Sequence, residues 1–493
     1  MSDEDAQADG APLGRRPTVS DVVAVSNRGD GFAYVPDEVL LRRNAAARLR
    51  ELTRTEIERE EDEALAEEEF EARLDELFPP VATREDLRGG RGWRRAERVD
   101  RPLEVIEVLV AEGFDAQPNH VMFAHNCGSP CPPHPSAVQD LVRSGLLANP
   151  LKANPLKANP LKANPLKANH PMENTAVPVK DPPLAARELH GPGPHPHVVV
   201  LDTGFAGTTP AALSTSGSAV DHRPAFLVAA TGVLGQARIT GDSDLPDNEI
   251  TLPSGAPLAA PDGYLDPAAG HGTFIAGIVE QLAPGCTIEV RRVVGPLGDA
   301  VESTVADTID TVVEEFKNDP QTRPFILSLS FGGQAPEPPG YLREAVARAI
   351  KAGIPIVASA GNDGVCTPQY PAAFPGVVAV AALGPDGPPP WTNYGDWVDA
   401  CAPGVDLVSA FFDHFDGAFP TMNSFDADHF DGWAEWSGTS FAVPVVVAAV
   451  ARELVCAPVG TADRVALLAA AVDRVVRAPH LARLPCLGTV VNI

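Results

Sequence analysis

Four nearly continuous apolar runs recur in the second half of the chain, and amphipathic helical patterns separate them. The runs are HVVVLD, RPFILSLSFG, IPIVASAG and VVAVAAL, which begin at His197, Arg323, Ile354 and Val377. Runs without polar alternation are typical of parallel strands that helices cover on both faces. Helical patterns follow His271 and occupy 300–317 and 341–352, and Gly353 stands where a C-terminal helix cap belongs. The sequence therefore predicts an α/β fold with a doubly wound parallel sheet over residues 195–493.

The chain before this unit divides into three parts. Residues 1–20 are polar, and we expect them to be disordered. Residues 21–125 mix strand and helix patterns, which indicates a small α+β domain. Its acidic helix over 49–78 is either a partner-binding helix or, as we favour, a solvated helix. Residues 126–194 form a Pro-rich linker with four ANPLK repeats at 148–169, and this five-residue period is too short for a stacking repeat.

Charge and cysteine content exclude several classes of protein. With 38 Lys and Arg against 66 Asp and Glu, the net charge is −28, which argues against nucleic acid or an anionic membrane as partner. The N-terminus lacks the apolar core of a signal peptide, so we expect a cytoplasmic protein and leave export by another route open. The seven cysteines are scattered and form no disulfide framework, and we expect Cys286, Cys401 and Cys456 to be buried.

Three motifs offer an acid, a base and a nucleophile in the order Asp, His, Ser. Asp202 ends a strand in VVVLDTG, His271 lies in GHGT at the start of a helical pattern, and Ser440 ends SGTS before an apolar helix. A serine hydroxyl attacks only when a base takes its proton and a carboxylate orients that base. Each motif alone also fits a turn, a cap histidine or an N-cap, but their order favours the catalytic interpretation.

A fourth motif, ASAGNDG, places Asn362 between a strand end and a glycine, where it is either a turn residue or an oxyanion donor. With these motifs, residues 195–457 resemble the catalytic domain of the subtilisin-like serine proteases (subtilases). The resemblance implies that Asp202 orients, His271 acts as base and Ser440 attacks, with Asn362 in the oxyanion hole. It implies a serine endopeptidase that forms an acyl-enzyme and needs no cofactor for its chemistry.

The same resemblance implies where polypeptide substrates bind. SLSFGG at 328–333 resembles the family's substrate-pairing strand, and residues 358–361 resemble a wall of its specificity pocket. The implied substrate-binding residues are Ser328, Ser330, Phe331, Gly332, Gly333, Ala358 and Gly361. Residues 102–125, which end in PNHVMFAH, resemble the end of the family's inhibitory propeptide. This implies a self-processing proenzyme whose own N-terminal domain occupies the cleft, with a cut near His125 or in the linker.

Two segments depart from the family's pattern. Asp202 and His271 lie 69 positions apart, and residues 411–432 precede Ser440 as a second insert, so we expect inserted surface loops at 205–262 and 411–432. In the second we expect an acidic solvated loop that contains Asp413, His414, Asp416, Asp426, Asp428, His429 and Asp431.

Metal sites are weakly indicated, and we assign no metal ligand. A structural calcium ion is possible at Asp242, Asp244, Asp247 and Glu249, but Pro246 and a missing glycine break the EF-hand pattern. A zinc site could include His125, Cys127, Cys131 and His134, but the spacings match no common zinc module, and a disulfide or free thiols are favoured.

Two other functions remain as alternatives. The first is a catalytically silent binding module whose cleft is held by the N-terminal domain. The second is another serine hydrolase, such as an esterase, but that class carries G-x-S-x-G and the order Ser, Asp, His, and neither occurs around Ser440.

Overall fold

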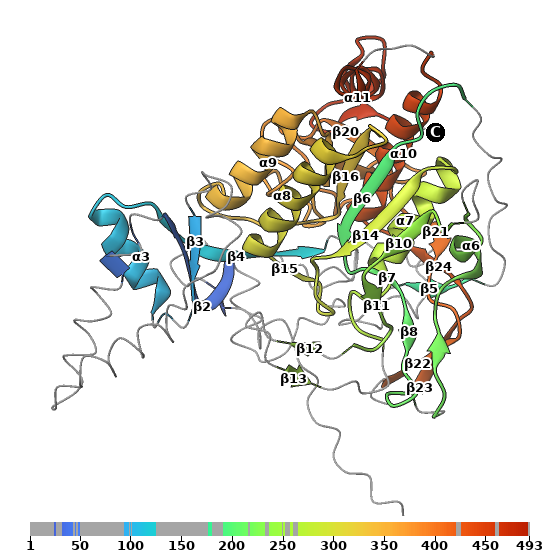
Figure 1. The fold of residues 1–493 in the computed structure, drawn as a ribbon, viewed down its shortest axis with the longest axis horizontal. Helices are drawn as coiled ribbons and strands as arrows, with labels where there is room; N and C mark the ends of the chain where they lie inside the picture. Colours follow the sequence, from blue (N-terminus) through green and yellow to red (C-terminus); the bar gives the residue numbers. More distant parts are fainter. Residues whose placement is uncertain are drawn as a thin grey trace, which may run out of the picture.

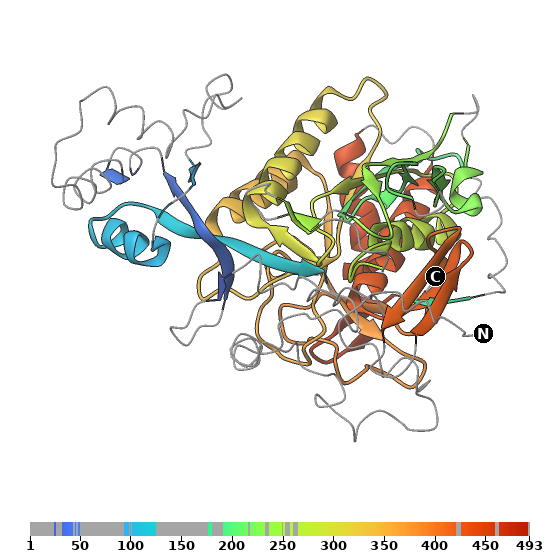
Figure 2. The same ribbon diagram turned by 90° about the horizontal axis from the view of Figure 1, so that it is seen from below.

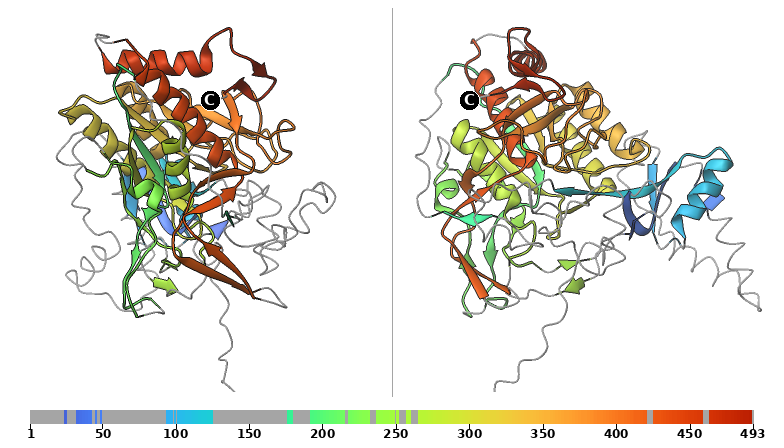
Figure 3. Two further views of the ribbon diagram at one scale, coloured as in Figure 1. Left: turned by 90° about the vertical axis from the view of Figure 1, so that its right-hand side faces the viewer. Right: turned by 180° about the vertical axis from the view of Figure 1, so that it is seen from behind.

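The structure is a computed structural model, in which a small N-terminal unit (residues 24–124) projects from a larger α/β unit (residues 191–491) (Figure 1). Figures 2 and 3 show the same arrangement from other sides, with one long strand running from the small unit into the large one. The described residues are 24–25, 32–42, 45, 48–49, 93–97, 99, 101–124, 176–179 and 191–491, the last range with gaps at 215–216, 232–235, 249, 252–256, 260–264, 421–424 and 459–462.

Among the described residues, the core of the α/β unit is a nine-stranded sheet. Its strands are, in spatial order, β10 (Ile239–Gly241), β14 (Thr287–Arg292), β6 (His197–Asp202), β16 (Phe325–Leu329), β18 (Ile356–Ser359), β19 (Val378–Leu383), β20 (Ala400–Pro403), β26 (Gly488–Val490) and β25 (Arg483–Leu484). All neighbours are parallel except the last pair. Because β6 and β16 are buried on both faces, their apolar runs lack alternation, and the predicted α/β fold is confirmed.

Helices cover both faces of this sheet (Figure 1). On one face, α7 (His271–Leu282) packs against α10 (Thr439–Val455), and on the other α8 (Glu302–Asn318) packs against α9 (Gly340–Ala352). Gly353 adopts φ 89° at the end of α9, as predicted for a glycine cap. Near the C-terminus, α11 (Arg464–Val472) continues into a π-helical turn, Asp473–Arg477.

The N-terminal unit is a small antiparallel sheet with one described helix. Its elements are β1 (Ala24–Val25), β2 (Ala33–Arg42), β3 (Trp93–Ala96), α3 (Pro102–Ala111) and β4 (Ala116–Ala124). The helix gives way to a turn at Gly113, with φ 87°, as expected, but the next strand begins at Ala116 rather than near Val121. That strand starts earlier because residues 116–118 pair with β2 before the chain reaches the α/β unit.

The first insert contains α6 (Ala225–Val228) and short strands. These strands are β7 (Phe205–Ala206), β8 (Thr208–Thr209), β9 (Val220–Asp221), β11 (Ser243–Asp244), β12 (Ile250–Thr251) and β13 (Pro257–Ala259). Because Asp244 and Leu227 are buried, this segment is part of the unit's interior as well as its surface.

The second insert corrects an expectation. Residues 411–432 are not an acidic loop but hold an antiparallel hairpin, β22 (Phe415–Pro420) and β23 (Phe425–Phe430). The rings of Phe411, Phe412 and Phe430 are fully buried at its base, so burial of aromatic surface fixes the hairpin on the core. The hairpin connects β21 (Leu407–Ala410) with β24 (Trp433–Trp436), which also pairs with β5 (Val177–Pro178) from the region after the repeats.

Several expectations fall outside the described residues: the disordered N-terminus, most of the acidic helix at 49–78, the ANPLK repeats, Glu249, and the segment with His125, Cys127, Cys131 and His134. The cysteine expectation is partly wrong. Cys286 and Cys401 are buried, but Cys456 is exposed because it caps the C-terminal end of α10. Within the described part of the chain, no helix is both long enough and apolar enough to cross a membrane.

Candidate active site

Two of the three predicted catalytic side chains are in direct contact. Asp202 ends β6 at the carboxyl edge of the sheet, and His271 is the first residue of α7. The Nδ1 atom of His271 lies 2.8 Å from Oδ1 of Asp202, and both side chains are fully buried. A carboxylate only accepts hydrogen bonds, so Nδ1 carries the proton and Nε2 is left with its lone pair. Among the described residues, Nε2 has no hydrogen-bond partner.

Glycines bring this pair together. Gly270 adopts φ 79°, and a Cβ there would lie 2.3 Å from the ring of Phe411. A Cβ on Gly272 would lie 2.5 Å from the carbonyl oxygen of Gly204, in the turn that follows Asp202. Only glycine permits this approach of α7 to the turn, which explains the GHG sequence around His271.

Ser440 is the second residue of α10, and Gly438 takes the cap position, so the N-cap interpretation of Ser440 is wrong. Its hydroxyl donates to the carbonyl of Ser330 (3.0 Å), and the hydroxyl of Ser330 donates to the carbonyl of Ser440 (2.9 Å). The Ser440 carbonyl accepts this bond because Pro444, four residues on, has no N–H to donate to it. Pro444 thus leaves the Ser440 carbonyl available to the Ser330 hydroxyl, and the two reciprocal hydrogen bonds hold Ser440 against the predicted substrate strand.

Asn362 lies beside the first turn of α10. Its Oδ1 accepts from the backbone N–H of Thr439 (3.0 Å) and from its hydroxyl (2.8 Å). This fixes the amide so that Nδ2 points elsewhere, and among the described residues that buried nitrogen has no partner. Asn362 therefore presents a free donor next to Ser440.

Sequence reasoning missed an aromatic enclosure around His271. The indole of Trp436 meets the imidazole edge-on, with centroids 5.5 Å apart, and the ring of Phe441 lies at 5.2 Å. Phe274 packs against both rings. These residues immediately flank the GHGT and SGTS motifs, so their positions could have indicated that they wall the site.

The predicted substrate strand contacts a segment of the N-terminal unit. After Ser330 the chain forms β17 (Phe331–Gly332), which pairs antiparallel with the end of β4. On its other edge β4 pairs with β15 (Asp299–Val301), and the Ala124 N–H donates to the carbonyl of Gly298 (2.8 Å). The strand β4 thus lies between two strands of the α/β unit and ends beside Ser330.

The other predicted substrate-binding residues lie on the strands and turns next to Ser330 and Asn362. Ser328 is buried inside β16, Gly333 bridges to Tyr370, and Ala358 lies within β18. Gly361, with φ 109°, directly precedes Asn362 and donates its N–H to the hydroxyl of Thr439 (3.2 Å). The substrate residues with the most direct contacts to β4 are Phe331 and Gly332.

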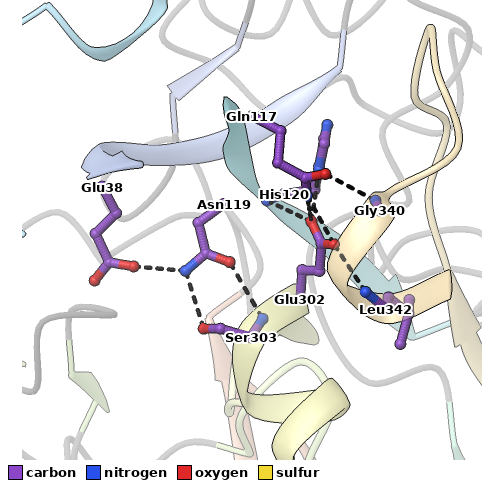
Figure 4. A network of polar contacts seen from close by, with 8 residues as sticks. All are labelled: Glu38, Gln117, Asn119, His120, Glu302, Ser303, Gly340 and Leu342. Atoms are coloured by element: carbon purple, nitrogen blue, oxygen red, sulfur yellow. Dashed lines mark hydrogen bonds and ion pairs between the residues drawn. The ribbon is translucent and has the colours of Figure 1, made fainter. Parts of the chain in front are cut away.

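A buried carboxylate anchors β4 to the α/β unit (Figure 4). Glu302, the first residue of α8, accepts from Nε2 of Gln117 (2.9 Å) and is 2.7 Å from Nδ1 of His120. It also accepts from the N–H of Leu342 in the first turn of α9 (3.1 Å). Gln117 in turn accepts from the N–H of Gly340 (2.8 Å). Side chains of one unit therefore cap helices of the other.

The acidic residues that the structure describes in the first insert are not grouped as metal ligands. Among the described residues, no group of three or more His, Cys, Asp or Glu side chains is placed to hold an ion. Asp244 instead turns inward, where its Oδ2 accepts from the hydroxyl of Thr203 and from the N–H of Gly270, each at 2.8 Å. Its contacts are with the turn and helix that carry Asp202 and His271.

The chain is similar to known proteases over this region. It is 30% identical over 255 residues to an extracellular serine proteinase of Thermus sp. (strain Rt41A), covering 50% of this chain and 56% of the relative. It is 31% identical over 187 residues to subtilisin-like protease 2 of Trichophyton verrucosum (37% and 40%), and 27% over 222 residues to subtilisin Savinase of Lederbergia lenta (43% and 72%). The chain thus spans about half the length of the first two relatives.

Two solved structures are also similar. A serine-to-alanine mutant of the PatA protease domain matches with TM-score 0.41 and 22% identity over 62% of this chain and 95% of that one. The prenylagaramide maturation protease PagA matches with TM-score 0.35 and 23% identity over 53% and 76%. The profile of the subtilase family, Peptidase_S8, matches residues 193–465, which is more than half of the 493 residues. The chain belongs to the subtilase family.

Proposed function

We propose that this protein is a serine endopeptidase made as a self-processing proenzyme. The observation that carries the proposal is the buried Asp202–His271 hydrogen bond, which leaves Nε2 of the histidine as a base in the site that also contains Ser440 and Asn362. This is the arrangement that nucleophilic acyl transfer requires: an oriented base, a hydroxyl and a free oxyanion donor.

The chemistry follows from these positions. The Ser440 hydroxyl would exchange its hydrogen bond to the Ser330 carbonyl for one to Nε2 of His271. It would then attack a peptide carbonyl while Nε2 takes its proton, and Asp202 would stabilise the imidazolium through Nδ1. Nδ2 of Asn362, whose amide is held by Thr439, stabilises the negative charge on the carbonyl oxygen. The imidazolium protonates the leaving amine, and a water molecule activated by His271 then hydrolyses the acyl-enzyme.

Polypeptide substrates would bind as β4 does, extended between β15 and β17. Because Ala124 lies opposite Phe331 in an antiparallel pair, β4 is directed toward Ser330, whose carbonyl accepts from the hydroxyl of Ser440. We therefore propose that the first cut falls just after Ala124, in the His125 region, and not in the repeats. The N-terminal unit would then act as an inhibitory propeptide that stays in the cleft until it dissociates.

The test compares the intact mass of purified wild type and Ser440→Ala, each with and without a fluorophosphonate probe. We expect wild type to be cut shortly after Ala124 and labelled on Ser440, while the variant stays full-length and unlabelled. If both stay full-length and neither reacts, residues 24–124 are removed with an added protease and labelling is repeated. Wild type that is still unreactive would refute the proposal and favour a silent binding module.

A further inference from the structure

We propose that Asp244, a buried carboxylate of the first insert, is a positioning residue that fixes Asp202 and His271 relative to each other. The proposal rests on the proposed function of those two residues. Asp244 lies in β11, which pairs in parallel with β7, and β7 begins three residues after Asp202. The first insert therefore pairs with the strand that directly follows the turn after Asp202.

Hydrogen bonds around Asp244 form a closed ring with the catalytic pair. Its Oδ2 accepts from the Thr203 hydroxyl and from the Gly270 N–H. Thr203 is bonded in turn to Asp202, because its N–H donates to Oδ1 (2.8 Å), the oxygen that also contacts His271. Gly270 directly precedes His271. One carboxylate oxygen thus links the residue after the acid to the residue before the base.

A second bond shows why a carboxylate is needed. The Thr203 hydroxyl accepts from the N–H of Gly272 (3.1 Å), in the first turn of α7, so its own proton must be donated elsewhere. Asp244 accepts that proton, and at the same oxygen it accepts the Gly270 N–H. Its other oxygen, Oδ1, accepts from Nδ2 of Asn248 (3.4 Å), so both oxygens face donors, and an amide would turn hydrogens of its own toward one of them.

The burial of Asp244 costs free energy and indicates a role other than stability. Its side chain is 1% exposed, and burial raises its pKa to about 6, although Gly270, Thr203, Arg292 and Asn248 all stabilise the charged form. Burial therefore disfavours the ionised form on folding, and this cost grows from about pH 4 and is fully present above about pH 6. Retaining a charge at such a place is expected where geometry matters more than folding free energy.

Among the described residues, few charged groups lie near Asp244. The charge of Arg292 stabilises ionised Asp244, and Thr203 and Gly270 separate Asp244 from Asp202 and His271. Asp266 accepts from the backbone N–H of Asn248 (2.7 Å), whose side chain also bonds Asp244. Asp242, two residues away, accepts instead from the N–H of Arg292 (2.8 Å) on the exposed side. Within the described part of the chain, the Asp242 side chain makes no hydrogen bond to the turn that follows Asp202, which makes it a matched control.

The experiment measures self-cleavage of the full-length chain in wild type, Asp244→Asn and Asp242→Asn. The segment to be cut is already bound in this reaction, so its rate reports chemistry and not affinity. We expect Asp244→Asn to be slower by about 10²-fold, the scale of a misplaced catalytic group, and Asp242→Asn to match wild type. Asp244→Asn should unfold at the same or a higher temperature, since it removes a charge whose burial is unfavourable.

Two further measurements separate positioning from a general structural effect. The self-cleavage rate of wild type should fall as pH falls through about 6, because Asp244 becomes protonated. The pH–rate profile of Asp244→Asn should lack this step. Thr203→Ser keeps the hydroxyl and should retain the wild-type rate, whereas Thr203→Val should be as slow as Asp244→Asn. The double variant Thr203→Val with Asp244→Asn should be little slower than either single variant, because both substitutions break the same ring of hydrogen bonds.

The proposal is overturned if Asp244→Asn cleaves as fast as Asp242→Asn, or if it is slow only in proportion to its loss of stability. Failure of the proposed function gives a different result, since wild type then does not cleave itself. In that case the proton on Nδ1 of His271 is observed by NMR in full-length Ser440→Ala. Its resonance should shift when Asp244→Asn is added and stay in place with Asp242→Asn, and the absence of a shift refutes the positioning role.

Discussion

Glu302 is the single residue whose loss should most weaken the hold of the N-terminal unit on the cleft. Its carboxylate is completely buried and takes two side-chain bonds from β4, one from Gln117 and one from His120. Hydrogen bonds to a charged group contribute about 1.5–3 kcal/mol each, roughly twice as much as neutral ones. Glu302→Gln keeps the shape but removes the charge, so it should weaken these two bonds by about 2–3 kcal/mol in total, or about 30- to 150-fold in Kd.

The assay uses the full-length chain after self-cleavage, when the two units are held by non-covalent contacts alone. The processed complex is diluted in steps, and peptide hydrolysis is measured per active site counted with a fluorophosphonate. The concentration at half-maximal activity gives the Kd of the N-terminal unit. In Glu302→Gln, activity should appear at about 30- to 150-fold higher protein concentration than in wild type.

Glu314→Gln is the matched control, because it removes the same charge from α8 at a residue that pairs with Lys317 on the outer surface (3.1 Å). It should leave the dilution curve unchanged. Gln117→Leu tests the same bonds from β4, and its effect should overlap with that of Glu302→Gln and not add to it. If Glu302→Gln and Glu314→Gln give the same Kd, the network in Figure 4 does not hold the propeptide and the reasoning is refuted.

Two other outcomes are expected. Asn362→Ala should slow self-cleavage by roughly 10²–10³-fold, the loss known for one oxyanion donor in a subtilisin, and a change of less than tenfold in a cleavage time course would show that Nδ2 is not that donor. Burial raises the pKa of the Cys286 thiol to about 12 and that of Cys401 to about 11, so iodoacetamide at pH 8 should modify only exposed thiols such as Cys366, Cys456 and Cys486 in the described part of the folded chain. Peptide mass mapping checks this, and equally fast labelling of Cys286 would contradict it.

The sequence predicted those parts of the molecule that local pattern determines. Uninterrupted apolar runs predicted the parallel strands, and the helical pattern that follows GHGT placed His271 on the first turn of a helix. The motif order predicted the meeting of Asp202 with His271, although 69 positions separate them. These predictions succeeded because each depends on a few adjacent residues and on the rule that sites form at the carboxyl edge of a parallel sheet.

Tertiary contacts decided what the sequence did not predict. The acidic cluster around Asp244 suggested calcium only weakly and gave Asp244 no other role, whereas the fold shows that it faces Thr203 and Gly270. Nothing in the sequence indicated a role for Glu302, the first residue of α8, because its partner His120 lies on β4 of the N-terminal unit. The hairpin at 411–432 was mistaken for a loop because its charges hid the phenylalanines that anchor it. In each case, the partner lies on an element that sequence spacing does not connect.

The two buried carboxylates also separate the two steps by which such an enzyme becomes active. In the activation that we propose, a cut after Ala124 would remove one covalent link but leave β4 paired with β15 and β17 and bonded to Glu302. Such a cut would lower only the effective concentration of the N-terminal unit, and the processed enzyme would stay inhibited until that unit dissociates. On this proposal, Asp244 would act on the rate of the first step and Glu302 on the extent of the second. A substitution at one residue should thus leave the other measurement unchanged, because their contacts share no residue.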